Sequence, residues 1–466
     1  MIATFGRFFA ERFRRWIPDS FIFAIMLTLI AAAMALLFVG AKPFGIVQAW
    51  YKGFWVLLAF AMQMVLILVT GFAIAISPPA EKFLDWLSKK VKTPVAVYGV
   101  VTFAGLIFSM ISWGWIVLTA VLAREMAKRV KGVDYCLLAA CVYSSNLGWH
   151  GGLSGSIPLV LNTPNNFLIQ AKVLETTIPT TMTLLNPMNI GVCVGLLIVL
   201  PVLMILMRPA DNQVTEFADM VDEEHKAIRP MTVEEEANTL KLPDKNLSDA
   251  LNSSIILQFI IVIAGLWFLV HHFATKGFDI NLNIMNFLFI ILGMLAHKTP
   301  LRYLVAMKRS CSNISGIVLQ FPFYAGIMGI MIHTGLGKAI AVWIAGFATV
   351  STYPFIAFII GGVVNIWVPS GGGEWAVIGQ PILEAAKTLG ASLPKEQLTE
   401  LFARSSMAVA YGDAWTNMIQ PFWTLAFLPV MAAGTKMQAR DIMGYTFVSM
   451  IVSFFIYAIC VTWLPI

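Results

Sequence analysis

The chain has 466 residues, of which 59% are hydrophobic and 12% are charged, and its mean hydropathy is +0.80. This composition excludes an ordinary soluble domain, in which about a quarter of the residues are charged. The net charge of +6 is no sign of a nucleic-acid partner, because the basic residues cluster at the ends of apolar segments, as in membrane proteins.

Several segments carry no charge over a length that can cross a bilayer, which takes roughly 20 residues in a helix. The clearest are 21–40, 54–76, 190–207, 255–270, 314–332 and 442–466. The first is too long for the apolar core of a cleaved signal peptide, and we expect it to remain as a span.

The basic residues predict the orientation of these spans. They cluster at 7–15, 82–92, 124–131, 208, 298–309 and 436–440. Short loops rich in Lys and Arg face the cytoplasm. We therefore predict a multi-pass protein of the bacterial inner membrane with a cytoplasmic N-terminus and a periplasmic C-terminus.

Matched residues at a constant offset predict an internal repeat. Gln63 and Gln320 lie 257 residues apart, and Trp86 and Trp343 keep that offset. Ser112 and Ser370 keep the same offset to within one residue. Both of these serines follow apolar segments and precede glycine- and tryptophan-rich turns.

In chain order, we expect residues 1–208 to form the first membrane repeat. It would contain spans at 21–40 and 54–76, a re-entrant hairpin at 95–123, a broken span at 135–171 and a span at 190–207. Residues 209–250, rich in acids, would form a cytoplasmic polar linker, and 251–274 a connecting transmembrane helix.

Residues 275–466 would form the second repeat. Its expected elements are spans at 282–297 and 314–332, a hairpin at 353–390, a broken span at 405–434 and a span at 442–466. Each repeat crosses four times and one crossing separates them, so the second is inverted. The predicted fold class is an all-α polytopic membrane protein, an inverted-repeat ion-coupled transporter with two re-entrant hairpins and two broken transmembrane helices.

Four polar interruptions point to a transport site. They are SMISWGW (109–115), YSSNLGWHGGLSGS (143–156), NIWVPSGGGEW (365–375) and YGDAWTNMIQP (411–421). Broken helices occur at membrane depth only where they line a cavity or are buried in protein. Paired breaks in two halves are typical of secondary transporters.

Asp413 is the first candidate for binding the coupling ion. An acid in apolar surroundings is costly, so it should face a cavity and have a partner. With Thr416 and Asn417 it could bind Na⁺, or alone it could carry a proton; the alternative is a cap of a half-helix. Glu374 is a weaker candidate, and capping of the following helix is the favoured role.

The substrate candidates are small and polar. Three glycines before a helix expose backbone amides that suit an anion, although an inert tight turn is the alternative. The expected residues are Ser112, Ser145, Asn146, Gly152, Ser154, Ser370, Gly371, Gly372 and Gly373, with Gln63 and Gln320 as further possibilities. His150 could shuttle protons, but packing or hydrogen bonding is favoured because no acid is near in sequence.

The remaining features restrict the substrate. Tryptophans beside the breaks predict an apolar pocket, and no arginine lies within a span to bind a second carboxylate. The pocket therefore suits one carboxylate with a short apolar tail. We expect no cofactor and no metal beyond a transported Na⁺. The glycine- and methionine-rich spans are compatible with a homodimer but indicate no interface.

At these residues the chain resembles the bacterial short-chain fatty acid transporter family, of the acetoacetate and butyrate permease type. The resemblance covers nearly the whole chain and is carried by WIPDSFIFAIMLTL (16–29), GFWVLLAFAMQ (53–63), HKTP (297–300), QFPFYAG (320–326), VPSGGG (368–373), AYG (410–412) and RDIMGY (440–445). It implies uptake of acetoacetate, butyrate and similar monocarboxylates by symport with H⁺ or Na⁺. Export or exchange of another organic anion is the alternative. A passive anion channel is less favoured, and an enzyme is not expected because no hydrolase or protease motif occurs.

Overall fold

The computed structural model describes residues 20–221, 231–241, 246–420 and 423–465. Every regular element in these ranges is a helix, and one isolated β-bridge joins Val221 and Thr435. Among the described residues, seven helices are long and apolar enough to cross a membrane, and they include Pro94–Ile111 but not the shorter Leu282–His297. The predicted all-α membrane class is confirmed. The basic cluster at 7–15 and the acidic run at 222–224 lie outside the described residues.

The predicted spans correspond to helices whose ends differ by a few residues from those expected. These are α2 (Ser20–Val39), α4 (Leu58–Ala75), α11 (Pro187–Leu206), α15 (Ile255–Lys276), α16 (Leu282–His297), α18 (Ser315–Thr334) and α24 (Met443–Trp463). Two short helices that we had not predicted, α3 (Pro43–Gly53) and α17 (Pro300–Ser310), precede α4 and α18. Each begins with proline, whose fixed φ suits the first helical position.

The two predicted hairpins are pairs of helices with a non-helical serine between them. The first consists of α6 (Pro94–Ile111), a short turn and α7 (Ile116–Arg129), and the second of α20 (Tyr353–Asn365) and α21 (Gly371–Leu389). Ser112 has φ −150° and ψ 125°, and Ser370 has φ −158° and ψ 105°. The two hairpins therefore break at the same kind of extended residue.

The two broken spans also follow the prediction in position. The first runs through α8 (Tyr135–Ser144), a 3₁₀ segment (η2, Ser145–Gly151) and α9 (Ser156–Leu161). The second runs through α22 (Lys395–Thr416), a 3₁₀ turn (η6, Asn417–Ile419) and α23 (Thr424–Met431). The order of span, short helix, hairpin, broken span and span thus occurs twice, with α5 (Pro78–Lys90) and α19 (Leu336–Ala345) as the short helices.

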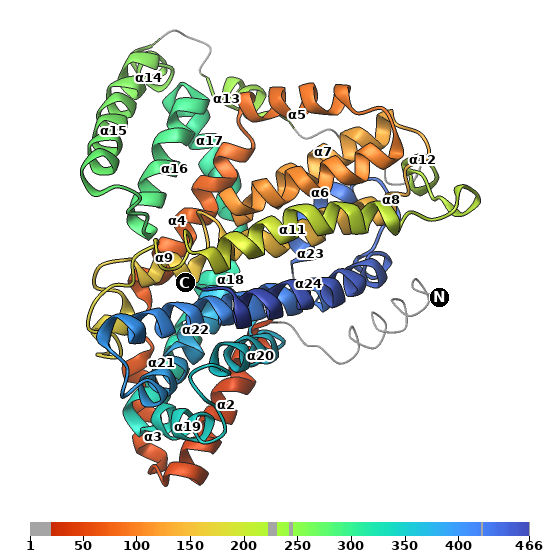
Figure 1. Cartoon of the computed structure of the whole chain (residues 1–466). Coiled ribbons are helices and arrows are strands. Elements are labelled where there is room, and N and C mark those ends of the chain that lie inside the picture. The colour runs from red at the N-terminus through yellow and green to blue at the C-terminus, as the bar shows by residue number, and fades with distance from the viewer. Residues whose placement is uncertain (1–19, 222–230, 242–245, 421–422, 466) are drawn as a thin grey trace.

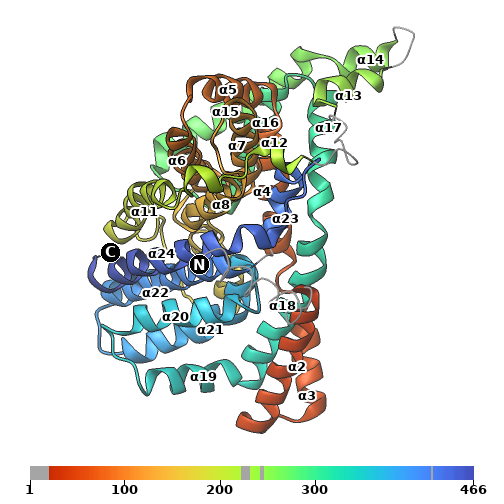
Figure 2. The same ribbon diagram turned by 90° about the vertical axis from the view of Figure 1, so that its right-hand side faces the viewer.

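The two halves exchange their first helices. From the first half, α2 and α3 pack on α18, and from the second half, α16 and α17 pack on α4. Figure 2 shows α2 and α3 beside the lower end of α18, and α17 directly above it. Each half is therefore completed by helices of the other.

Polar and amphipathic helices lie at opposite ends of the molecule. In Figure 1, α5, α13 (Val233–Thr239) and α14 (Leu247–Asn252) lie at the top, whereas α3 and α19 lie at the bottom. The linker helix α13 contacts α17, where Glu234 pairs with Arg302 and Glu236 pairs with Arg309. Part of the polar linker is thus docked on the short amphipathic helix α17.

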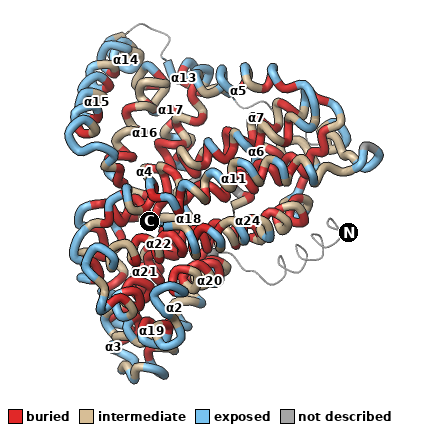
Figure 3. The backbone as a smooth tube through the Cα atoms, viewed as in Figure 1, coloured by how far each residue is buried: buried red, intermediate tan, exposed pale blue. Residues whose placement is uncertain are grey.

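Buried residues concentrate where the halves meet (Figure 3), and large apolar side chains on the outer helices are exposed. Leu37 is 76%, Leu206 is 77% and Trp267 is 78% exposed. Exposed apolar patches of this extent are unfavourable in water and suit a surface that faces lipid.

We predict that Gly53→Ala destabilises the protein and that Gly45→Ala on the same helix does not. A Cβ atom at Gly53 would lie 2.3 Å from the Ala325 oxygen and 2.5 Å from the Gly329 Cα, whereas one at Gly45 meets only the Lys42 Cβ at 4.0 Å. Overpacking of this kind costs about 1–3 kcal/mol. Thermal unfolding in detergent measures both variants. An unchanged transition temperature for Gly53→Ala would show that α3 and α18 are not in close contact.

Candidate functional site

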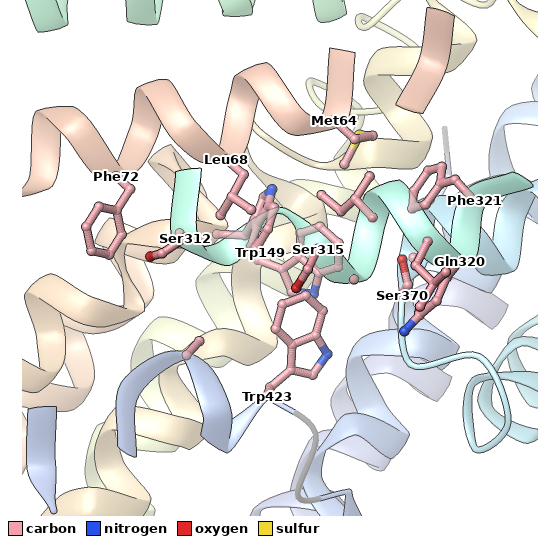
Figure 4. A pocket seen from close by; sticks show the side chains of 18 of the residues that line it. Met64, Leu68, Phe72, Trp149, Ser312, Ser315, Gln320, Phe321, Ser370 and Trp423 are labelled. Carbon is pink, nitrogen blue, oxygen red and sulfur yellow. The ribbon is translucent and has the colours of Figure 1, made fainter. Parts of the chain in front are cut away.

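A cavity of about 420 Å³ lies where the two halves meet and is lined by residues from both (Figure 4). Its volume falls in the range of small-molecule sites, about 300–1,000 Å³. Ser312 and Ser315, at the start of α18, are exposed, so the cavity reaches the outside there. The lining residues are Phe21, Met64, Leu68, Phe72, Trp113, Gly114, Val117, Trp149, Ser312, Ser315, Gly316, Ile317, Leu319, Gln320, Phe321, Ser370, Gly371, Gly372, Trp423 and Ala426.

The polar part of the cavity is the N-terminus of α21. The Ser370 hydroxyl accepts a hydrogen bond from the Gly373 amide (3.3 Å), and the Ser370 carbonyl accepts one from the Glu374 amide (2.7 Å). Gly371 and Gly372 are the first two residues of α21. Their amides therefore have no carbonyl group one turn earlier in the helix to accept their hydrogen bonds. They lie at the positive end of the helix dipole, which favours an anion.

The corresponding tip of the first hairpin is closed. There the Trp113 amide donates to the Ser154 hydroxyl at 2.8 Å, so a side chain occupies the place that an anion would take. Ser112 is buried, its hydroxyl has no hydrogen-bond partner among the described residues, and it lies behind Gly114 of the cavity wall. Of the two related tips, the second is therefore the one open to a ligand.

Three tryptophans form the apolar wall. The ring centroids of Trp113 and Trp149 are 6.3 Å apart, those of Trp113 and Trp423 are 5.4 Å apart, and those of Trp149 and Trp423 are 6.3 Å apart. They come from the first hairpin, the first broken span and the second broken span. A ligand tail in the cavity would therefore touch aromatic faces from both halves.

His150 and Asp413 form a buried pair between the two broken spans. The imidazole Nε2 lies 3.0 Å from Asp413 Oδ2, and both side chains are 0% exposed. The Asn417 amide also donates to Oδ2, at 3.0 Å, whereas Oδ1 has no hydrogen-bond partner among the described residues. Sequence reasoning disfavoured a proton role for His150 for lack of a nearby acid, but the acid lies 263 residues away in the chain.

Glu374 brings a second carboxyl group to this pair. It is 0% exposed, and no N–H or O–H donor of another described residue reaches its carboxyl oxygens. Its carboxyl group lies within hydrogen-bonding reach of the Asp413 carboxyl, so the two groups can share a proton. The favoured role of Glu374 was a helix cap, but Ser370 is the residue that caps α21.

Asn365, which was not predicted as a site residue, connects the second hairpin to the second break. Its side-chain amide lies 2.9 Å from each of three acceptors, which are the Asp413 carbonyl, Thr416 Oγ1 and Asn417 Oδ1. Its carbonyl accepts from the Gln420 amide at 2.6 Å. The oxygens of Thr416 and Asn417 that we expected to bind the coupling ion are thus engaged by Asn365.

Most of the other predicted residues support packing and do not line the cavity. The Ser145 hydroxyl donates to the Val142 carbonyl (2.7 Å), and a Cβ atom at Gly152 would lie 2.0 Å from the Met110 oxygen. Asn146 is buried outside the cavity wall, and Gln63 donates to Asn283. Gln320, in contrast, lines the cavity beside Ser370 (Figure 4).

The sequence matches known proteins over its whole length. The family described as Short chain fatty acid transporter matches residues 1–464. Two curated relatives carry the provisional name short-chain fatty acid transporter. The one from Escherichia coli (strain K12) is 40% identical and covers 99% of this chain and 100% of its own. The one from Haemophilus influenzae (strain ATCC 51907 / DSM 11121 / KW20 / Rd) is 36% identical and covers 97% of each.

Two solved structures share the fold. The Alcanivorax borkumensis YdaH transporter, described as having an unusual topology, superposes with a TM-score of 0.57 at 16% identity, over 96% of this chain and 98% of its own. Neisseria gonorrhoeae MtrF, described in connection with a class of antimetabolite efflux pumps, superposes with a TM-score of 0.55 at 17% identity, over 96% of each chain. At these identities the likeness establishes the fold alone.

We predict that Asn365→Ala lowers the stability of the protein more than Asn283→Ala. Removing the Asn365 amide leaves several buried acceptors unsatisfied, at about 1–3 kcal/mol for such a group. Asn283 makes an exposed hydrogen bond with Gln63, so its loss should cost less. Thermal unfolding of the two variants in the same detergent provides the comparison. Equal transition temperatures would show that Asn365 does not hold the break in place.

Proposed function

Because the chain belongs to the short-chain fatty acid transporter family, we propose that it takes up short monocarboxylates such as acetoacetate and butyrate, in symport with a cation. The membrane would be the bacterial inner membrane. Such acids have a pKa of about 4–5 and are almost wholly ionised at neutral pH. The bilayer therefore admits only a trace of them, and uptake needs a carrier.

The observation that carries this proposal is the cavity at the N-terminus of α21. The carboxylate would accept hydrogen bonds from the amides of Gly371 and Gly372, and the short tail would lie against Trp113 and Trp149. The described lining residues include no Lys or Arg. A second carboxylate would have no countercharge there, which favours monocarboxylates over dicarboxylates.

The buried acid beside this cavity supports coupling to a cation. Asp413 is 0% exposed inside a broken helix and lies at the interface of the two halves. Ionisable residues at membrane depth are costly and commonly mark ion pathways. We assign the coupling role to Asp413, with Asn417 as its hydrogen-bonding partner.

Alternating access would follow from an inverted repeat. The basic helices α5 and α17 lie at one end of the molecule, and their counterparts α19 and α3 lie at the other (Figures 1 and 2). We propose that the basic end faces the cytoplasm, with a cytoplasmic N-terminus and a periplasmic C-terminus, as the basic clusters of the sequence indicate. The cavity opens beside Ser312 and Ser315, which follow α17 in the chain, so in this orientation it would face the cytoplasm.

Uptake of labelled acetoacetate into proteoliposomes tests the proposal. An imposed Na⁺ gradient and an imposed pH gradient are compared, with protein-free liposomes measuring the leak of neutral acid. Accumulation above the leak under either gradient supports symport. If the folded protein gives no accumulation under either, monocarboxylate symport is wrong, and counterflow with a panel of organic anions then tests exchange or export.

We predict that Gly371→Ala abolishes most uptake, whereas Gly316→Ala does not. A Cβ atom at Gly371 would lie 2.4 Å from His150 Cε1 and would crowd the carboxylate site, but one at Gly316 meets only Gln320 Nε2 at 3.9 Å. Both glycines line the cavity. We expect at least a tenfold loss of affinity for Gly371→Ala, about 1.4 kcal/mol, from concentration-dependent uptake. Wild-type affinity in this variant would exclude the α21 N-terminus as the carboxylate site.

A further inference from the structure

His150 adjoins both Asp413 and Gly371, the first residue of the candidate carboxylate site. Its Nε2 atom is 3.0 Å from Asp413 Oδ2. At the same edge of the ring, a Cβ atom at Gly371 would approach Cε1 to 2.4 Å and Nε2 to 2.5 Å, so the ring is also in contact with the first residue of α21. One imidazole thus adjoins both a fixed carboxyl group and the place where a substrate carboxylate would bind.

We propose that the coupling ion is a proton, that His150, Asp413 and Glu374 together hold it, and that the cluster takes up one proton for each monocarboxylate bound. This inference rests on the proposed function and identifies its coupling ion. The three groups come from η2, α22 and α21, so the proton is held where both broken spans meet the second hairpin.

The number of protons bound per substrate follows from the need for charge neutrality in a buried site without water. A net charge away from water is far more costly than a neutral, hydrogen-bonded arrangement. Without substrate, His150, Asp413 and Glu374 would together hold the number of protons that makes the cluster neutral, because two adjacent buried carboxylates cannot both be ionised beside a single imidazole ring.

Substrate binding changes this sum by one charge. The incoming carboxylate adds one negative charge beside His150, and one proton from the aqueous phase restores neutrality by binding to the cluster. Asp413 Oδ1, which has no hydrogen-bond partner among the described residues, can receive that proton while Oδ2 keeps its bond from Asn417. The loaded site carries one substrate anion and one added proton, so the cycle moves no net charge.

The surroundings favour a proton over Na⁺. Na⁺ needs several converging oxygens, but Thr416 Oγ1 and Asn417 Oδ1 already face the Asn365 amide at 2.9 Å. The Asn417 side chain presents its NH₂ group to Asp413, and that donor would repel a cation. A proton needs only the free carboxyl oxygen.

Among the described residues other than Glu374, the titratable side chains of the neighbouring helices are engaged with other partners or lie further along the helices, and do not contact the His150–Asp413 pair. The Tyr143 hydroxyl donates to the carbonyls of Asn417 and Gln420, and the Tyr457 hydroxyl donates to the carbonyl of Leu147. Cys193 on α11 faces the Gly151 carbonyl and Asn189. The other charged residues of α21 and α22 lie nine or more positions away from Glu374 and Asp413 on their helices. They are Glu384, Lys387, Lys395, Glu396, Glu400 and Arg404.

Proton uptake on binding gives the decisive measurement. Acetoacetate is added to detergent-solubilised protein in weakly buffered solution near neutral pH, and a pH indicator reports the protons taken up. The free substrate is fully ionised, so any proton taken up must bind to the protein. Because binding of the substrate and of the proton favour each other, we expect about one proton per bound substrate. Saturable binding without proton uptake would overturn this inference but leave the proposed carrier function intact. An absence of saturable binding would count against the proposed function itself.

Transport assays provide an independent readout. Accumulation of acetoacetate in proteoliposomes should follow a pH gradient and should not change when a potassium diffusion potential is imposed. Dependence on a Na⁺ gradient, or on the membrane potential, would refute one-to-one proton symport.

Two variants and one control connect the effect to the cluster. Asp413→Asn mimics the protonated acid, so it should exchange acetoacetate in counterflow but lose proton uptake and gradient-driven accumulation. His150→Gln should lose proton uptake as well. The control His297→Gln changes a histidine that is also 0% exposed but donates a hydrogen bond to the Ala73 carbonyl, away from the cluster. This variant should keep both proton uptake and accumulation. Full pH-driven accumulation by Asp413→Asn would contradict the assignment, and the wild-type proton measurement stands even if a variant fails to fold.

Discussion

The bilayer supplies no hydrogen bonds, and this constraint governs the whole structure. Every helix that breaks at membrane depth must have its free amides and carbonyls satisfied by the protein itself. Arg124 does so for the end of α23, where it donates to the carbonyls of Val430, Met431 and Ala433. Arg404 does the same at the end of α24, donating to Val461 and Leu464. Ser154 and Asn365 perform the corresponding task at the breaks themselves.

Against this background, the second hairpin tip differs from the first. The amides at the start of α21, the Glu374 carboxyl and Asp413 Oδ1 lie close to His150. At the first hairpin tip, in contrast, the Ser154 hydroxyl accepts the hydrogen bond of the Trp113 amide. We infer that the second tip is left incomplete because a ligand and a proton complete it during transport.

The sequence predicts the elements well and their contacts poorly. Apolar length identified the spans, and glycine, serine and asparagine identified the breaks, because these signals are local. His150 and Asp413 form a pair although they lie 263 residues apart in the chain. The Asn365 amide meets three hydrogen-bond acceptors that only the fold brings together. The short helices α3 and α17 were missed because each has only 11 residues, too few to be recognised as a membrane span.

The exchange of helices between the halves has a consequence for biogenesis. The partners of α4 are α16 and α17, which are synthesised more than 200 residues later. When the ribosome has completed the first half, α4 is therefore in the membrane without the helices that cover it, and lipid must occupy that face. Later insertion of α16 and α17 displaces this lipid, so neither half can reach its final packing alone, and the exchanged helices cannot all pack before α18 has been synthesised.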